Sequence, residues 1–149
     1  MKIAGTISGI LAKKGSTVWS ILPAATVFDA IALMADKNIG ALPVVENNRL
    51  IGIISERDYT RKVILKGKSS QETRVEEIMT RHLVTADPSD TVVDCMRVMT
   101  EERVRHLPVI KGAKIIGVLS IGDLVKCLIS AQAETIDNLE HYLTGAILD

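Results

Sequence analysis

The chain contains two copies of one motif, because residues 26–64 align without a gap with residues 91–129, an offset of 65 positions. The identical pairs include Thr26/Thr91, Asp29/Asp94, Pro43/Pro108, Gly52/Gly117, Ser55/Ser120 and Asp58/Asp123. A unit that occurs only twice is too small to bury its apolar face alone. We therefore expect the copies to pack about a pseudo-two-fold axis, to share one core and to form any site between them in two related versions.

The composition limits the class of protein and of partner. A length of 149 residues suits one globular domain made of two halves. Hydrophobic residues make up 47% of the chain but aromatic residues only 3%, so the core must consist of aliphatic side chains. Eighteen basic and eighteen acidic residues cancel. The chain therefore lacks the long-range field that non-specific nucleic-acid or membrane-surface binding requires, and we expect neither partner.

Cysteines and hydropathy predict a cytoplasmic protein. Cys95 and Cys127 fall inside predicted helices, where they are interpreted as small buried hydrophobic residues, which fits a reducing compartment. The sequence has no uninterrupted apolar run long enough to span a membrane. The start of the chain, residues 1–5, lacks the features of a signal peptide.

Each copy is predicted to fold as strand, helix, strand, strand, helix, which is an α/β (α+β) arrangement. The expected first strands contain residues 18–20 and 83–85, and each is followed by a proline that disfavours helix before it. Amphipathic helices follow at 26–37 and 91–102, hairpins at 41–45/50–55 and 106–110/115–120, and last helices that end near residues 64 and 129.

The segments outside the two copies are predicted to be a linker and two extra helices. We divide the chain into residues 1–65 (an N-terminal helix and the first repeat), 66–80 (the linker), 81–131 (the second repeat) and 132–149 (a C-terminal helix). The linker is polar and ends in a helical turn at 75–79. The flanking helices are expected at 6–13 and 135–144, the second with Ile136, Leu139 and Leu143 on one side.

The most informative motif is Gly, two aliphatic residues and Ser-x-x-Asp, at 52–58 and again at 117–123. Ser-x-x-Asp has an ordinary explanation as a helix cap, and Thr26-x-x-Asp29 shows the same spacing without any need for a ligand. The motif also brings a strand to a helix N-terminus, where free N–H groups can bind a phosphate and the aspartate can accept two sugar hydroxyls. Spacing alone leaves both interpretations open.

The whole repeat resembles a pair of cystathionine beta-synthase (CBS) domains, also called a Bateman module. The similarity covers residues 16–129 and includes the strands that begin Gly40-Ala41-Leu42-Pro43 and Arg105-His106-Leu107-Pro108. The flanking helices fit the short stand-alone bacterial members. The resemblance implies a disc-like pair with two interfacial clefts that each hold an adenine nucleotide, AMP first, with ATP or NAD(H) as alternatives.

The resemblance also assigns roles to residues. Asp58 and Asp123 would receive the ribose hydroxyls, and Ser55 and Ser120 would lie near the phosphate. Each adenine would contact the wall of the opposite repeat: Thr17, Val18, Trp19, Ile39 and Gly40 for one cleft, and His82, Leu83, Val84, Val104 and Arg105 for the other.

Three charged or polar positions differ between the copies and predict that the clefts prefer different ligands. Arg57 and Arg105 are the expected phosphate contacts, with His106 as a polar addition. A solvated surface arginine remains the alternative for both arginines, and Trp19 could instead fill the core.

No catalytic arrangement is predicted. The histidines His82, His106 and His141 are scattered, and neither a P-loop nor a Rossmann glycine motif is present in the sequence. We therefore expect a nucleotide sensor that is not an enzyme, that acts on an unidentified partner protein and that forms a homodimer through the first helices of its repeats, as the resemblance implies. The alternative is a ligand-independent dimerisation or docking module.

Overall fold

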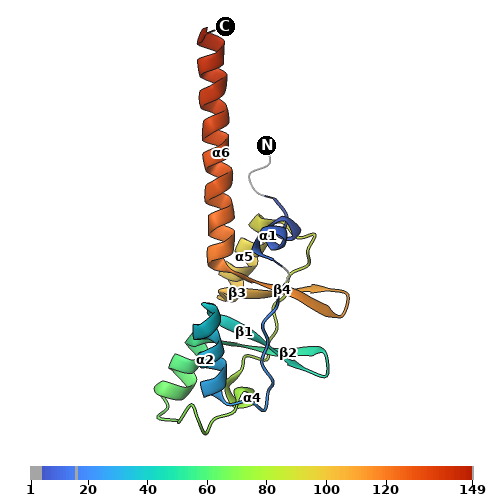
Figure 1. Cartoon of the computed structure of the whole chain (residues 1–149), viewed down its shortest axis with the longest axis vertical. Helices are drawn as coiled ribbons and strands as arrows, with labels where there is room; N and C mark the ends of the chain where they lie inside the picture. The colour runs from blue at the N-terminus through green and yellow to red at the C-terminus, as the bar shows by residue number, and fades with distance from the viewer. Residues whose placement is uncertain (1–4, 16, 149) are drawn as a thin grey trace.

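Two antiparallel β-hairpins form the centre of the protein. The computed structural model describes residues 5–15 and 17–148, with side chains as far as residue 141. The hairpins are β1 (Ala41–Glu46) with β2 (Arg49–Ser55), and β3 (His106–Lys111) with β4 (Lys114–Ser120). Their registers are equivalent, including a shift at the same place in each, and they lie one above the other with their turns on one side (Figure 1). The α+β fold and the predicted hairpins are confirmed.

Equivalent helices follow the same local rules in both repeats. α2 (Val27–Lys37) and α5 (Val92–Glu102) each begin after a threonine whose Oγ1 accepts the N–H of the third helical residue at 3.1 Å. α3 (Glu56–Tyr59) continues into the π-helix η1 (Thr60–Ile64). The remaining helices are α1 (Ile7–Lys14), α4 (Val75–Ile78) and α6 (Ile121–Leu148).

The predicted first strands are not regular strands. The backbone there is extended, but each segment forms a single parallel bridge, Ile21 with Val44 and Ala86 with Val109. The physical reason is that Pro23 and Pro88 follow closely and lack the N–H group that would extend the ladder.

The segment that leads into each repeat packs on the opposite repeat. α1 precedes the first repeat, yet Ile7 is fully buried in the core of the second, and its N–H donates to Asp90 O at 3.0 Å. α4 precedes the second repeat, yet Val75 is fully buried in the core of the first, and its N–H donates to Ala25 O at 2.8 Å. The core of each repeat is therefore completed by the segment that precedes the other repeat in the sequence.

This exchange gives the protein two cores, so the expectation of one shared core is wrong. One core joins α2, β1, β2, η1 and α4, and the other joins α1, α5, β3, β4 and α6. Both are aliphatic, as the composition predicts. Cys95 belongs to the second core, and burial, followed by the charges of Asp90 and Asp94, raises the pKa of its thiol to about 11. Cys95 therefore behaves as a small hydrophobic residue, whereas Cys127 is only half-buried.

The predicted break between the last helix of the second repeat and a separate C-terminal helix is wrong. α6 is one helix of 28 residues, because residues 130–134 (Ser-Ala-Gln-Ala-Glu) contain no helix breaker and follow the preceding turns directly. It extends well away from the rest of the protein (Figure 1). The side chain of Leu143 and residues 1–4 lie outside the described part of the chain. Within residues 5–15 and 17–148, no helix combines the length and apolarity needed to cross a membrane.

Gly52→Ala tests the close contact between β2 and the segment after α4. A Cβ at position 52 would lie 2.7 Å from Met79 Sδ and 3.1 Å from Thr80 O. Because overpacking of this kind forces backbone or side chains to shift, we expect the free energy of unfolding to fall by about 1–3 kcal/mol. Thermal unfolding should show a decrease of about 2–4 °C for each kcal/mol. Gly122→Ala is the control, since its Cβ would lie 3.6 Å from the nearest atom, Ser120 Oγ, and should leave the midpoint unchanged or raise it. Equal midpoints for the two variants would contradict this contact.

Candidate functional site

Two clefts lie between the repeats, and each combines the Ser-x-x-Asp junction of one repeat with the wall of the other. The first cleft has a volume of about 620 Å³ and contains the junction of the first repeat. The second cleft has a volume of about 360 Å³ and contains the junction of the second. All the residues proposed from the sequence line these clefts. The first cleft is lined by Ser55, Arg57, Asp58, His82, Leu83, Val84, Val104 and Arg105, the second by Thr17, Val18, Trp19, Ile39, Ser120 and Asp123, and both by Gly40 and His106.

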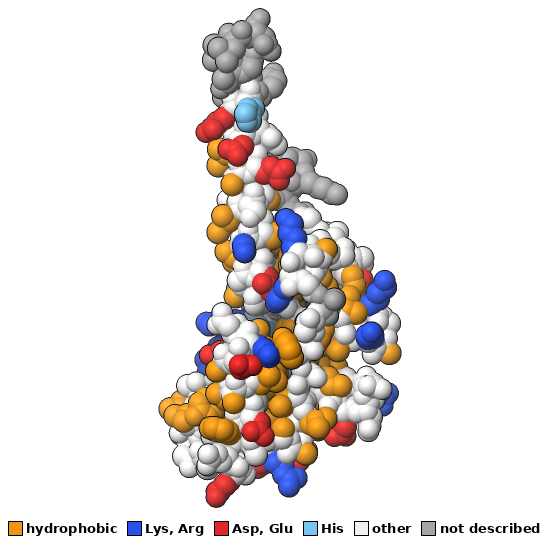
Figure 2. All heavy atoms as spheres, viewed as in Figure 1, with side chains coloured by type: hydrophobic (Ala, Val, Ile, Leu, Met, Phe, Trp, Pro, Cys, Tyr) orange, Lys and Arg blue, Asp and Glu red, His pale blue; other side chains and the backbone are white. Residues whose placement is uncertain are grey.

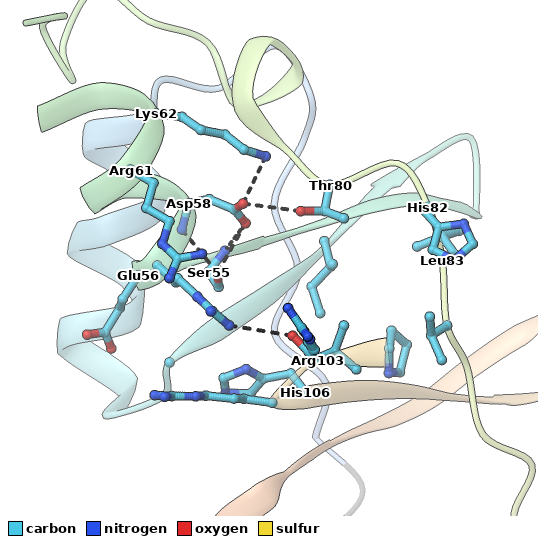
Figure 3. Close-up of a pocket in the computed structure, with 17 residues that line it drawn as sticks. Ser55, Glu56, Asp58, Arg61, Lys62, Thr80, His82, Leu83, Arg103 and His106 are labelled. Carbon is cyan, nitrogen blue, oxygen red and sulfur yellow. Dashed lines mark hydrogen bonds and ion pairs between the residues drawn. The ribbon is translucent and has the colours of Figure 1, made fainter. Parts of the chain in front are cut away.

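Asp58 is the most buried polar group of the first cleft, and four donors surround its carboxylate (Figure 3). Oδ2 accepts the N–H of Ser55 at 2.9 Å and its hydroxyl at 3.1 Å. Oδ1 accepts the hydroxyl of Thr80 at 3.1 Å and lies 3.0 Å from the ammonium of Lys62. The helix-capping interpretation is therefore confirmed for this pair. The same carboxylate also lines the cleft, so capping and ligand binding do not exclude each other here.

Asp123 has an equivalent arrangement in the second cleft. Its Oδ2 accepts the N–H of Ser120 at 2.8 Å and the ammonium of Lys14 at 2.7 Å. Lys14 also donates to Val118 O at 2.8 Å, which fixes the end of α1 at the edge of the cleft. In both clefts the aspartate thus accepts a donor from the segment that leads into the opposite repeat, Thr80 for Asp58 and Lys14 for Asp123.

The environment of Asp123 lowers the pKa of its carboxyl group. Partial burial acts to raise this pKa, but the hydrogen bond and charge of Lys14, together with the hydrogen bonds from Ser120, outweigh that effect. The carboxylate is therefore ionised at neutral pH and is held in place by an ion pair that is partly shielded from water.

The two clefts differ strongly in charge. Five cationic side chains and two carboxylates line the first cleft: Arg57, Arg61, Lys62, Arg103 and Arg105 against Glu56 and Asp58. One cation and one carboxylate, Lys14 and Asp123, line the second. One guanidinium group can bind two phosphate oxygens at once. The side chains of the first cleft are therefore suited to binding a polyanionic ligand, and those of the second to binding a ligand of little charge.

His106 forms a wall that the two clefts share with Gly40. A Cβ at Gly40 would lie only 3.2 Å from His106 Nε2, so the absence of a side chain there lets the imidazole occupy the boundary. Burial is the main cause that lowers the pKa of His106. The charges of Lys14 and Arg105 lower it further, while Asp123 acts in the opposite direction. The imidazole is therefore neutral at physiological pH.

Trp19 lies at the edge of the second cleft, and 41% of its surface is exposed. The core-filling alternative for this residue is therefore wrong. The ammonium of Lys37 lies 4.2 Å from the centre of its ring, a distance typical of a cation–π interaction. One face of the indole is thus already covered.

The sequence prediction omitted several polar residues that complete the clefts: Lys14, Arg61, Lys62, Thr80 and Arg103. Lys62 lies one turn after Asp58, so its i,i+4 spacing was a usable signal. Lys14 and Thr80 gave no such signal, because they reach the aspartates only through the exchanged packing of α1 and α4.

Sequence comparison identifies the repeats. The sequence profile of the CBS domain matches residues 16–64 and 75–130. The chain belongs to the CBS-domain family. The CBS domain-containing protein CBSX3 of Arabidopsis thaliana, a mitochondrial protein, is 42% identical over 150 residues, which cover 94% of this chain and 72% of that protein. YhcV of Bacillus subtilis, also a CBS domain-containing protein, is 30% identical over 126 residues, or 83% of this chain and 89% of that protein.

Solved structures agree with the family assignment. The crystal structure of the CBS domain NE2398 is 50% identical, with a TM-score of 0.80 and coverage of 83% of this chain and 97% of that chain. A candidate signal-transduction protein with CBS domains from Burkholderia ambifaria is also 50% identical, with a TM-score of 0.81 and coverage of 84% and 94%. A hexameric CBS-CP12 protein from bloom-forming cyanobacteria is 31% identical, with a TM-score of 0.73 and coverage of 82% and 71%. The tandem CBS fold is thus established for this chain, and the expected ligand contacts stay predictions.

Lys14→Met tests the ion pair that closes the second cleft. Loss of the ammonium leaves Asp123 partly buried without its main counter-charge, so we expect the pKa of its carboxyl group to rise. In the native protein the lowered pKa stabilises the fold above the ordinary aspartate value of 3.8, and this contribution is lost as the pH falls through the lower folded-state value. Denaturant unfolding should therefore show a larger difference between native and variant proteins near pH 7 than near pH 3. Lys13→Met is the matched control on the same helix. A difference that does not change with pH would contradict the role of Lys14.

Proposed function

We propose that this protein is a regulatory module that binds adenine nucleotides in its two clefts and transmits the bound state to a partner protein. The observation that carries the proposal is the first cleft, where a buried carboxylate lies beside a cluster of arginine and lysine side chains at a helix start. A sugar with vicinal hydroxyls and a phosphate chain supplies the complementary groups for this arrangement.

In the proposed complex the base contacts the opposite repeat, near Leu83 and Val84, and the ribose hydroxyls reach Asp58. Lys62 and Thr80 already occupy Oδ1 of that carboxylate, so a ribose must replace one of these donors. We take Lys62 as the donor that moves, because 43% of its side chain is exposed, although its ammonium also donates to Ile78 O at 2.8 Å. A displaced ammonium would remain close enough to meet the phosphates.

The second cleft would take a smaller or less charged ligand, because its volume is about 360 Å³ and its cation is committed to Asp123. AMP suits both clefts as the smallest member of the class, and ATP or NAD(H) would find phosphate partners only in the first. We propose that the clefts bind their ligand without turnover and that the protein is not an enzyme.

A ligand-independent docking module is the second candidate. Phe28 on α2 and Val93 on α5 are 48% and 45% exposed, and they lie on the helices through which a homodimer is expected to form. These residues would form the contact with a second copy or with the unidentified partner.

The half-buried thiol of Cys127 is compatible with a reducing compartment such as the cytoplasm, and we propose that the protein is located there.

Nucleotide titrations test the ligand class. At 100 times its dissociation constant, a ligand adds about 2.7 kcal/mol to the free energy of unfolding. For a chain of this size the melting temperature should rise by about 5–10 °C. In the first cleft we expect affinity to increase from AMP to ADP to ATP and to weaken with salt, because the cations there attract phosphate charge.

Asp58→Asn should abolish the ATP-dependent shift relative to the variant's own melting temperature. Asp29→Asn is the control, since Asp29 has the same helix-start spacing but lies outside both clefts. If no adenine nucleotide at millimolar concentration shifts the native protein, the docking function replaces the sensor function.

The pKa of His106 should change when a phosphate group binds in a cleft. A bound anion stabilises the imidazolium form, so we expect the lowered pKa of His106 to rise when AMP is added. The histidine NMR signals followed as a function of pH, with and without AMP, measure this change. His141 on α6 lies outside both clefts and serves as the internal control. Equal displacement of both histidine titrations would show a general salt effect instead of binding.

A further inference from the structure

The distal part of α6 carries an apolar stripe that faces solvent. Leu124 is fully buried and Leu128 packs against the second core, and an exposed apolar stripe lies beside this buried face of the helix. Val125 is 39% exposed, Ile129 61%, Ile136 56% and Leu139 57%. Figure 2 shows hydrophobic side chains gathered along one edge of the projecting helix. The match to the CBS-domain profile ends at residue 130, so most of this stripe lies beyond the repeat that gives the family its name.

The stripe has the spacing of a coiled coil. Positions 125, 129, 132, 136 and 139 alternate by four and three residues, which is a seven-residue repeat and not the broader face of a helix that packs on a globular core. Leu143, whose side chain is outside the described part, continues the same spacing in the sequence. β-branched Ile129 and Ile136 occupy equivalent positions, and Gln132 is the polar member. A repeat of this kind is complementary to another helix with the same repeat.

The charges beside the stripe select the orientation of the partner helix. Lys126 and Glu140 occupy equivalent flanking positions two heptads apart, and both are exposed. In a parallel pair each of them would face an uncharged residue of the other helix. In an antiparallel pair, in which Ile129 packs against Leu139 of the second copy, Lys126 meets Glu140 twice. This arrangement also uses nearly the whole length of α6 and places the two globular parts at opposite ends.

We propose that α6 pairs with α6 of a second copy of this chain as an antiparallel two-helix coiled coil. The partner helix comes from a second copy of the same chain, because α6 is complementary to itself. One helix carries both the apolar seam and the two opposite charges that the pairing requires. The contact is separate from both clefts and from the exposed residues of α2 and α5. It therefore stands or fails independently of nucleotide binding.

Light scattering after size-exclusion chromatography tests the pairing on the full chain. Ile136→Glu and Leu139→Glu place a charge in the seam, so each should reduce the molar mass of the native assembly by half. Asn138→Glu is the matched control, because it adds the same charge outside the seam and should leave the mass unchanged. The melting temperature, measured on the same samples, confirms that the globular part remains folded. A native protein that elutes as a monomer at micromolar concentration, or an assembly mass that both seam variants leave unchanged, would overturn the proposal.

Charge reversal tests the orientation. Lys126→Glu alone should weaken the assembly and raise its dissociation constant, since it places two glutamates together in the antiparallel pair. The double variant Lys126→Glu, Glu140→Lys should restore native association, because the opposite charges again face each other. If the double variant associates no better than Lys126→Glu alone, the antiparallel arrangement is wrong even where the seam variants halve the mass.

Discussion

The exchange of lead-in segments between the repeats is the contact on which the rest of the structure depends. Leu11 of α1 lies against Gly117 in β4, and Met79, which follows α4, lies against Gly52 in β2. Each glycine permits an approach that a side chain would block. These contacts close both cores, hold the repeats together and bring Lys14 and Thr80 to the aspartates of the clefts. The sites are therefore a consequence of how the cores are completed, and neither repeat could form a cleft by itself.

The same exchange explains why one short motif supports two kinds of chemistry. A serine and an aspartate at a helix start satisfy the free N–H groups there, and this stabilises the helix without any ligand. At Thr26 and Thr91 the equivalent pairs cap their helices and lie outside both clefts, and Asp94 also forms an ion pair with Arg97 at 3.2 Å. At Ser55 and Ser120 the opposite repeat covers the helix start, so the capping carboxylate becomes the wall of a hollow. All four positions share the cap from the hydroxyl to the N–H of the aspartate. The two junctions add the bond from the serine N–H to the aspartate and the cover of the opposite repeat.

The repeat made much of the fold and of the site predictable. The caps, hairpins and helices follow from residues that act on their neighbours, and the equivalence of Asp58 with Asp123 placed both junctions and their walls correctly. The single extended bridges, the division into two cores and the positions of Lys14 and Thr80 depend on contacts between segments distant in sequence. The sequence analysis predicted two helices in place of the single helix α6 for a different reason. The last helix of the first repeat ends near residue 64, and we expected the equivalent helix of the second repeat to end near residue 129, although residues 130–134 contain nothing that stops a helix.

His106 gives the two clefts a physical route by which one can influence the other. It borders both, and the charges that set its pKa come from both sides, from Lys14 and Asp123 of the second cleft and from Arg105 of the first. In the proposed nucleotide complexes, a phosphate in either cleft would change the electrostatic field at this imidazole, and so would change the free energy of binding in the other cleft. Because coupling is reciprocal, the cleft with more cations and the cleft with fewer must affect each other by the same factor. With two unequal clefts that share one neutral histidine, the proposed sensor would respond to the ratio of two ligands as well as to the amount of one.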